Sequence, residues 1–191
     1  RLRRKRGKLL HDRRGQIPDL VSVHDRPAEV EGREIAGHWE GDLILGKGKR
    51  GAIATLVERK TRYIMLCKLS APSAEQAWRK IAKRFSELPE DLRKSLTYDR
   101  GREMARHAKL TKAAKVKVYF CDPQSPWQRG TNENTNGLLR QYFPKGMDMT
   151  KVTKRDLRFV EDRLNGRPRK VLRFRTPHEV FTSHLRVALG G

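Results

Sequence analysis

The order of apolar and polar segments limits the folds open to this chain more than any other feature. Five short apolar runs are predicted as strands, at residues 38–45, 52–58, 63–69, 95–99 and 116–121. Helical spacing or helix-start residues predict five helices, beginning near residues 73, 103, 131, 153 and 176. The order β-β-β-α-β-α-β-α-α-α predicts an α/β fold, a mixed five-stranded sheet flanked by helices.

Helix-start residues sharpen three of these predictions. Ser73 is followed three residues later by Gln76, the pattern of a capping box. Thr153 and Asp156 are expected to cap another helix, and Thr176 precedes a proline suited to the first helical position. The segment 103–114 is predicted as a single helix.

The first strand places charged groups inside an apolar segment. Side chains alternate between the two faces of a strand, so four residues share one face: His38, Glu40, Asp42 and Ile44. Trp39, Leu43 and Leu45 share the other face. A carboxylate in such a strand is costly unless it is paired or bound to a metal, so Asp42 needs an explanation.

Charge indicates the kind of partner. The 191 residues include 44 lysines and arginines against 22 acids, a formal net charge of +22. Such a charge favours phosphate backbones, although a protein with basic tails, such as a ribosomal protein, would share it. Eight of the first 14 residues are basic, which predicts a flexible arm, and Pro18 and Pro27 predict an extended linker. Residues 1–33 are therefore expected to precede a domain at 34–187.

Cysteine and histidine patterns argue against other classes of site. Cys67 and Cys121 are far apart and form no C-x-x-C pair, so both are expected to be buried thiols. The histidines show no H-E-x-x-H arrangement. No apolar run of about 18 residues and no signal peptide is present, so we expect no membrane partner and a cytoplasmic location.

Three acids stand at the ends of predicted elements or inside them. Asp42 lies in the first strand, Asp99 ends the fourth, and Glu133 lies in the first turn of a helix. Two-metal phosphoryl transfer needs carboxylates that converge on two cations, and Mg²⁺ prefers such hard oxygen ligands. The ordinary alternatives remain open, since Asp99 suits a turn and Glu133 complements a helix dipole.

Four other residues are weaker candidates. Glu40 could support Asp42 or simply pair with an arginine, and Glu103 could point toward the site or cap a helix. His107 could contact substrate or lie on a helix surface. Trp127 could stack on a base or pack its proline-rich loop against the core.

Three motifs resemble those of a known family. They are WEGDL at 39–43, YDRG at 98–101 and DPQSPWQRGTNENTNGLLRQY at 122–142. They resemble the catalytic core of a DDE transposase of the insertion-sequence 30 family, related to retroviral integrases. The resemblance runs from about residue 20 to residue 185, and the third motif is the specific one.

The resemblance implies an RNase H-like fold and a metal-binding catalytic triad of Asp42, Asp99 and Glu133. The 33 residues between Asp99 and Glu133 suit that family. It also implies Mg²⁺ or Mn²⁺, expected as two ions, and a DNA substrate. The expected reaction is cleavage at transposon ends and transfer of 3′-hydroxyl ends to target DNA.

DNA contacts are expected from basic and aromatic residues around the third motif. Arg140 lies seven residues after Glu133, two helical turns along the same face. The other expected contacts are Arg129, Trp127, Lys145 and Arg100. A second basic region is expected to touch the DNA backbone, and it comprises Arg155, Arg158, Arg163, Arg167, Arg169, Lys170, Arg173 and Arg175.

Some features depart from the family pattern or stay open. No helix-turn-helix region for recognising element ends is identifiable, and the second motif reads DRGREM, a variant that keeps its acids. A homodimer or larger assembly on DNA is expected, because transposition holds two ends together. Two alternatives remain: a nuclease without strand transfer, and a DNA-binding module without catalysis.

Overall fold

The fold is built on one mixed sheet, and the computed structural model describes residues 17–190 of the protein. The strands follow the spatial order β3-β2-β1-β4-β5. Their bounds are β1 His38–Leu45, β2 Ala52–Glu58, β3 Ile64–Leu69, β4 Ser95–Tyr98 and β5 Lys117–Phe120. β1, β2 and β3 pair antiparallel, whereas β4 pairs parallel with both β1 and β5. The predicted mixed five-stranded sheet is confirmed.

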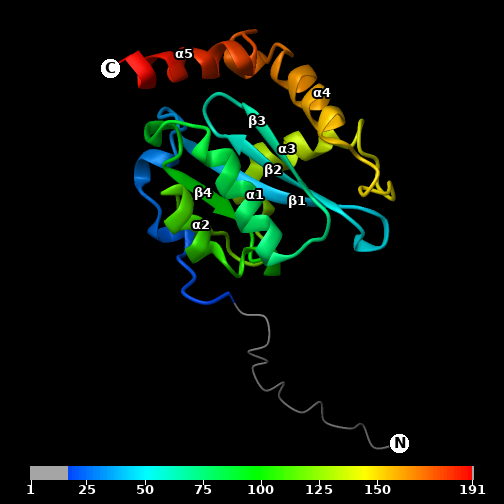
Figure 1. The fold of residues 1–191 in the computed structure, drawn as a ribbon. Helices are drawn as coiled ribbons and strands as arrows, with labels where there is room; N and C mark the ends of the chain where they lie inside the picture. Colours follow the sequence, from blue (N-terminus) through cyan, green and yellow to red (C-terminus); the bar gives the residue numbers. More distant parts are fainter. Residues whose placement is uncertain (1–16, 191) are drawn as a thin grey trace, which may run out of the picture.

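Within residues 17–190, five α-helices cover the sheet. They are α1 Ala74–Ser86, α2 His107–Ala114, α3 Gly130–Leu139, α4 Lys154–Asn165 and α5 Pro177–Gly190. In Figure 1, α1 and α2 lie on one face of the sheet and α3 on the other, while α4 and α5 run along its upper side. Seven short 3₁₀ turns join these elements, at 23–25, 28–30, 47–49, 90–92, 102–104, 126–129 and 170–172.

Alternation along the central strands creates two cores. In β2, Ala54 and Leu56 belong to the cluster under α1 and α2, whereas Ile53 and Val57 belong to the cluster under α3 and α4. In β1, Trp39 joins the first cluster, as its predicted face requires. The same alternation therefore turns the polar residues of β1 toward α3.

Helix starts follow the sequence prediction in part. Thr153 and Asp156 form a complete capping box at the start of α4. At α1 the Ser73 hydroxyl accepts from the Gln76 N–H, but the Gln76 side chain accepts from the backbone N–H of Ser70 instead of Ser73. The prediction of one helix over 103–114 is wrong, because the backbone leaves helical geometry at Arg106 (φ −109°, ψ 27°).

The prediction of an extended linker is wrong for its described part. Ile17 belongs to the main core cluster, and Val23 and Val30 are buried. The Phe120 N–H donates to the Val21 carbonyl at 2.9 Å, which ties this segment to β5. Three apolar side chains make packing favourable where the prolines alone suggested extension. The arm at 1–14 lies outside the described residues, and the domain boundary at residue 34 stays a prediction.

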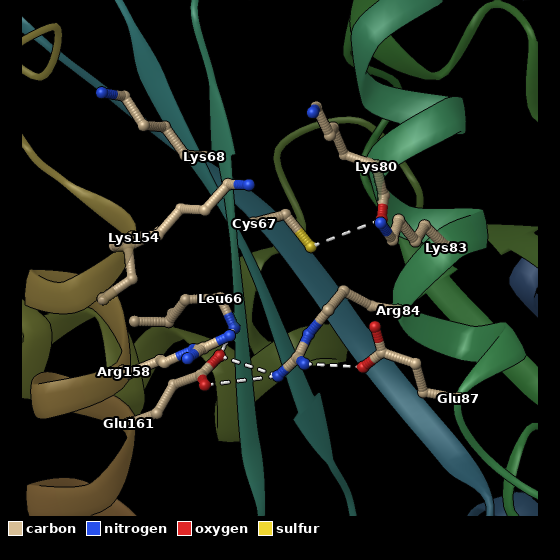
Figure 2. Close-up of a pocket in the computed structure, with 11 residues that line it drawn as sticks. Leu66, Cys67, Lys68, Lys80, Lys83, Arg84, Glu87, Lys154, Arg158 and Glu161 are labelled. Atoms are coloured by element: carbon tan, nitrogen blue, oxygen red, sulfur yellow. Dashed lines mark hydrogen bonds and ion pairs between the residues drawn. The ribbon is translucent and has the colours of Figure 1, made fainter.

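The β3 edge is covered by side chains of α4. Asn165 accepts from the Ile64 N–H at 2.8 Å and donates to the Ile64 carbonyl at 2.9 Å, and Glu161 accepts from the Leu66 N–H. Figure 2 shows Arg84 of α1 reaching across to Glu161 beside a basic hollow of about 220 Å³. These contacts satisfy an edge that would otherwise invite pairing with another chain. Arg158 of the second basic region lines this hollow, whereas the predicted catalytic acids and the DNA contacts expected around the third motif do not.

Candidate active site

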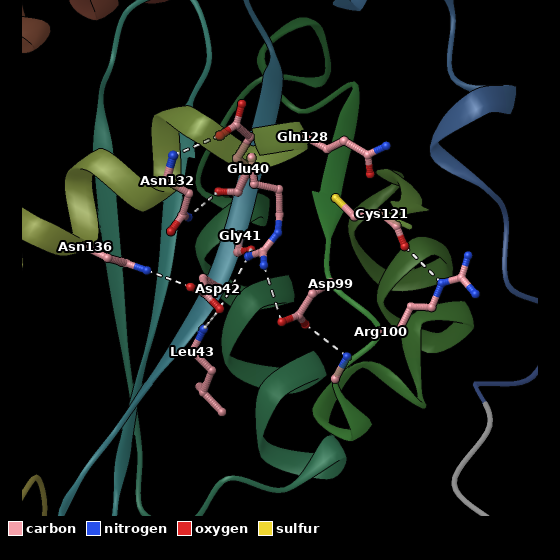
Figure 3. Close-up of polar contacts among 12 residues, drawn as sticks. Glu40, Gly41, Asp42, Leu43, Asp99, Arg100, Cys121, Gln128, Asn132 and Asn136 are labelled. Carbon is pink, nitrogen blue, oxygen red and sulfur yellow. Dashed lines mark hydrogen bonds and ion pairs between the residues drawn. The ribbon is translucent and has the colours of Figure 1, made fainter. Parts of the chain in front are cut away.

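The strand register places two of the predicted acids side by side. β1 and β4 run parallel, and Glu40 is paired with Thr97. Asp42 lies two residues further along β1, and Asp99 directly follows Tyr98, the last residue of β4, so both acids lie on the same side of the paired residues. Figure 3 shows both carboxylates pointing into the space below α3.

Gly41 leaves room for the side chain of Tyr98, the residue that precedes Asp99. A Cβ at Gly41 would lie 2.5 Å from the ring of Tyr98, far inside van der Waals contact. Tyr98 is fully buried and directly precedes Asp99. A glycine before the first acid therefore lets the residue before the second acid pack inward.

Arg129 lies between the two carboxylates. Its Nη1 is 3.4 Å from Oδ1 of Asp42, and its Nη2 is 3.4 Å from Oδ2 of Asp99. Nη1 also donates a 2.8 Å hydrogen bond to the Gly41 carbonyl. The side chain of Arg129 is only 13% exposed, so a single guanidinium fills the space between the acids.

The pKa values of Asp99 and Arg129 are both shifted from their usual values. Burial raises the pKa of Asp99; Arg129 opposes that rise and Asp42 adds to it. Burial would lower the pKa of Arg129, but Asp42 and Asp99 outweigh burial and raise it. The site is therefore a place where a positive charge is favoured and where ionised carboxylates are costly without one.

Helix α3 is fixed over the site by Asn132. Its side chain donates to the Glu40 carbonyl at 3.0 Å and accepts from the Thr55 hydroxyl at 3.2 Å. Its backbone N–H donates to Oε2 of Glu40 at 2.8 Å, while Oε1 of Glu40 accepts from Arg59 at 2.9 Å. Glu40 thus takes the arginine-paired role that the sequence left open, and it also holds the first turn of α3.

The structure does not gather all three acids. Asn136 of α3 donates to Oδ2 of Asp42 at 2.7 Å. Glu133, one turn earlier, is exposed and stands outside this network. Among residues 17–190 no group of three or more metal-ligating side chains is assembled. The triad therefore stays a prediction, with Asp42 and Asp99 adjacent and Glu133 on the neighbouring helix.

The weaker acidic and histidine candidates fall in different places. Burial raises the pKa of Glu103, and the charges of Asp99 and Asp42 add to the rise, so the Glu103 carboxyl group lies within reach of their charges. His107 is buried and its Nε2 lies 2.8 Å from the Pro18 carbonyl oxygen. Neither interpretation of His107 was right, because the segment predicted to be a linker covers it.

The other residues expected to contact DNA are exposed or half-buried. Trp127 is 70% exposed, so the expectation that it packs its loop against the core is wrong. Arg100 donates through Nε to the Cys121 carbonyl, and Arg140 donates to the Phe143 carbonyl, which orients both. Lys145 is exposed. Their contacts with DNA stay predictions.

Sequence reasoning missed the two asparagines that connect α3 to the acids. Asn132 and Asn136 are spaced by four residues, so they share one face of the helix. That spacing was the signal that the third motif offered, since both asparagines could face the polar side of β1 from one side of a helix. Both cysteines are buried thiols, as predicted.

The chain is similar to known proteins along most of its length. The chain matches the Integrase core domain family over residues 33–126. The transposase for insertion sequence element IS1086 from Cupriavidus metallidurans is 54% identical over 97% of this chain and 54% of its own length. Transposase InsI for IS30A from Escherichia coli K12 is 49% identical over 90% of this chain and 46% of its own length.

A solved structure supports the fold. The catalytic core domain of BIV integrase superposes with a TM-score of 0.59 at 16% identity, covering 78% of this chain and 95% of that one. The sheet and helices are thus those of an RNase H-like integrase core. Residues 33–126 belong to the integrase core domain family, and the proteins similar to most of the chain are transposases of insertion-sequence elements. The chain spans about half the length of these relatives.

No helix in the described part of the chain is both long and apolar enough to cross a bilayer.

Proposed function

We propose that this domain cuts phosphodiester bonds at transposon ends and joins the resulting 3′-hydroxyl ends to target DNA, with Asp42, Asp99 and Glu133 as its catalytic acids. The observation that carries the proposal is the adjacency of Asp42 and Asp99 on parallel strands, with Arg129 between them. Two carboxylates that share one positive group form a place suited to cations. The transposase relatives supply the substrate class.

The residues fit two divalent ions, Mg²⁺ or Mn²⁺, because such cations prefer carboxylate oxygens. Asp42 and Asp99 would hold them from the sheet. Glu133 would join from α3, since it lies one turn before Asn136, whose side chain already reaches Asp42. When bound, such ions activate the attacking oxygen and neutralise charge on the reacting phosphate.

Arg129 would then change partners. Its guanidinium now fills the space between the carboxylates, so it would leave them as metal enters. An arginine released at the edge of the site can fork onto phosphate oxygens, which is the DNA contact expected from the sequence. Arg100, Arg140, Lys145 and the exposed Trp127 would complete the DNA surface.

The biological setting follows from the relatives. Transposases of bacterial elements act on chromosomal DNA, so we place this domain in the cytoplasm, associated with the nucleoid when on DNA. Two ends must be held together for transposition, which favours a homodimer or larger assembly on DNA. The basic character of the chain, with a net charge of +22, suits this polyanionic partner.

A strand-transfer assay tests the proposal. Labelled transposon-end oligonucleotides, one uncut and one pre-cut, are incubated with a target duplex and the full-length transposase in Mn²⁺ at low salt. We expect joined products from the wild type and none from Glu133→Gln, while both bind DNA equally. Glu87→Gln is the matched control, because Glu87 is an exposed glutamate of the α1 end that pairs with Arg84.

Each of the other outcomes supports a different function or a different set of catalytic residues. Cleavage without joined products would support a nuclease without strand transfer. Binding with no cleavage in either protein would support a DNA-binding module. Cleavage by Glu133→Gln at the wild-type rate would remove Glu133 from the triad.

A further inference from the structure

A hollow of about 370 Å³ lies beside α3, away from the acid pair. Three arginines from distant parts of the chain line it: Arg33 before β1, Arg62 in the β2–β3 turn and Arg169 after α4. Thr131, Asn134 and Thr135 of α3 supply polar groups to its wall. No carboxylate is among the described residues that line it.

The residues of α3 that line this hollow and those that face β1 lie on different sides of the helix. Asn132 and Asn136, four residues apart, face β1. Thr131 and Thr135, also four residues apart, face the hollow about 100° further round the helix. Glu133 is followed directly by Asn134, which lines the hollow, so the hollow begins one residue away from the predicted catalytic acid.

The positive charge in the hollow is not balanced from within. Burial lowers the pKa of Arg62, and the neighbouring Arg33 lowers it further, against a smaller opposing effect of Glu40 and Glu58. Burial also lowers the pKa of Arg169, and the charge of Arg167 adds to that effect. Crowded guanidinium groups in a partly buried site gain most from an anion that binds between them.

Donor groups are available for such an anion. Arg62 uses one N–H group on the Thr131 hydroxyl at 2.6 Å, and Arg169 uses one on the Leu164 carbonyl at 3.2 Å. These bonds fix the direction of both side chains, and among residues 17–190 their other donors have no side-chain or carbonyl partner. Nε of Arg169 is buried without any acceptor in the described part of the chain.

We propose that this hollow binds a backbone phosphate of the DNA strand that the domain acts on, a contact distinct from the reacting phosphate. Guanidinium groups match phosphate oxygens with paired donors, and hydroxyl and amide side chains add further ones. The inference rests on the proposed function for the identity of the strand, and on the three arginines for the phosphate chemistry. Arg169, which lines the hollow, belongs to the second basic region predicted from the sequence to contact the DNA backbone.

DNA binding without metal tests the proposal. Arg33→Gln and Arg169→Gln are combined in the full-length protein, and Arg62 is kept because it also holds Thr131. Arg79→Gln with Lys112→Gln is the control, since it removes the same charge from exposed positions on α1 and α2. Affinity for a labelled short duplex is measured in EDTA over a range of salt concentrations.

We expect the double variant to bind roughly tenfold more weakly than the control near physiological salt, and its log–log salt slope to be smaller by about one. Equal affinities and slopes would overturn the site. The binding assay does not need catalysis. If the double variant shows the smaller salt slope but the wild type gives no strand transfer, the phosphate site in the hollow is supported and the proposed function fails. If the wild type gives strand transfer but the double variant has an unchanged salt slope, only the phosphate site in the hollow is refuted.

Two further measurements distinguish a DNA contact from a small-anion site and from a loss of stability at the end of α4. Thermal unfolding with inorganic phosphate should show a phosphate-dependent rise for the wild type and the control, and a smaller one for the double variant. A phosphate effect without any change in the DNA slope would assign the hollow to a small anion and overturn the DNA contact. Arg33→Gln alone, at an exposed position, should show part of the DNA effect even if losing Arg169 perturbs the end of α4.

Discussion

Replacing Arg129 by methionine should expose the cost of holding Asp42 and Asp99 together. The substitution removes a 2.8 Å hydrogen bond to a buried carbonyl and two ion pairs at 3.4 Å. A charged donor is worth about 1.5–3 kcal/mol, and each ion pair about 0.2–1 kcal/mol because Asp42 and Asp99 are 29% and 41% exposed. We expect a loss of roughly 2–4 kcal/mol in the free energy of unfolding at neutral pH.

The loss should depend on pH in a defined direction. Burial already raises the pKa of Asp99 above its usual 3.8, and Arg129 opposes that rise. Without Arg129 the pKa of Asp99 lies higher still in the folded state, so ionising it costs stability. Below pH 3.8 the carboxyl group is protonated in both the folded and the unfolded state, so the cost is absent. The cost grows as the pH rises from 3.8 to the higher pKa of Asp99 in the folded state. The deficit of Arg129→Met should therefore shrink toward pH 4.

Divalent metal should reverse part of the loss. If Arg129 occupies the place of a cation, Mn²⁺ should raise the unfolding midpoint of Arg129→Met more than that of the wild type at neutral pH. Arg129→Lys keeps a positive charge and should resemble the wild type. Urea unfolding with and without Mn²⁺ measures all three proteins. An equal or larger metal effect on the wild type would refute the reasoning.

Three further predictions concern packing and reactivity. Gly41→Ala should lower the free energy of unfolding by about 1–3 kcal/mol, because its Cβ would meet the tyrosine ring of β4, whereas Gly137→Ala on α3 meets nothing within 4 Å and should not destabilise; urea unfolding decides, and equal effects would contradict the clash. Asn132→Ala should cost about 1–3 kcal/mol by leaving buried partners unsatisfied, and an unchanged urea midpoint would argue against that tie. Burial raises the pKa of Cys67 to about 12 and that of Cys121 to about 11, so a thiol reagent at pH 8 should react slowly until urea unfolds the protein; fast reaction of the folded protein would contradict their burial.

Local patterns were enough to predict the elements and their order. Strand and helix periodicity depends on neighbouring residues, so the five strands, most helices and the alternating faces of β1 could be read from the chain. Failures occurred where distant packing intervened. The helix expected at 103–114 breaks at Arg106, and the segment expected to be a linker packs because β5 and the core accept its apolar side chains.

The sequence by itself determined the class of protein, its positive charge and which acids to suspect, because these depend on residue identity and short-range spacing. Only the tertiary structure decided that Asp42 and Asp99 are adjacent, since that depends on the parallel register of β1 and β4. It also decided that Arg129 lies between them and that Arg33, Arg62 and Arg169 meet beside α3. Contacts between residues far apart in sequence arise from packing of whole elements, and no local pattern encodes them.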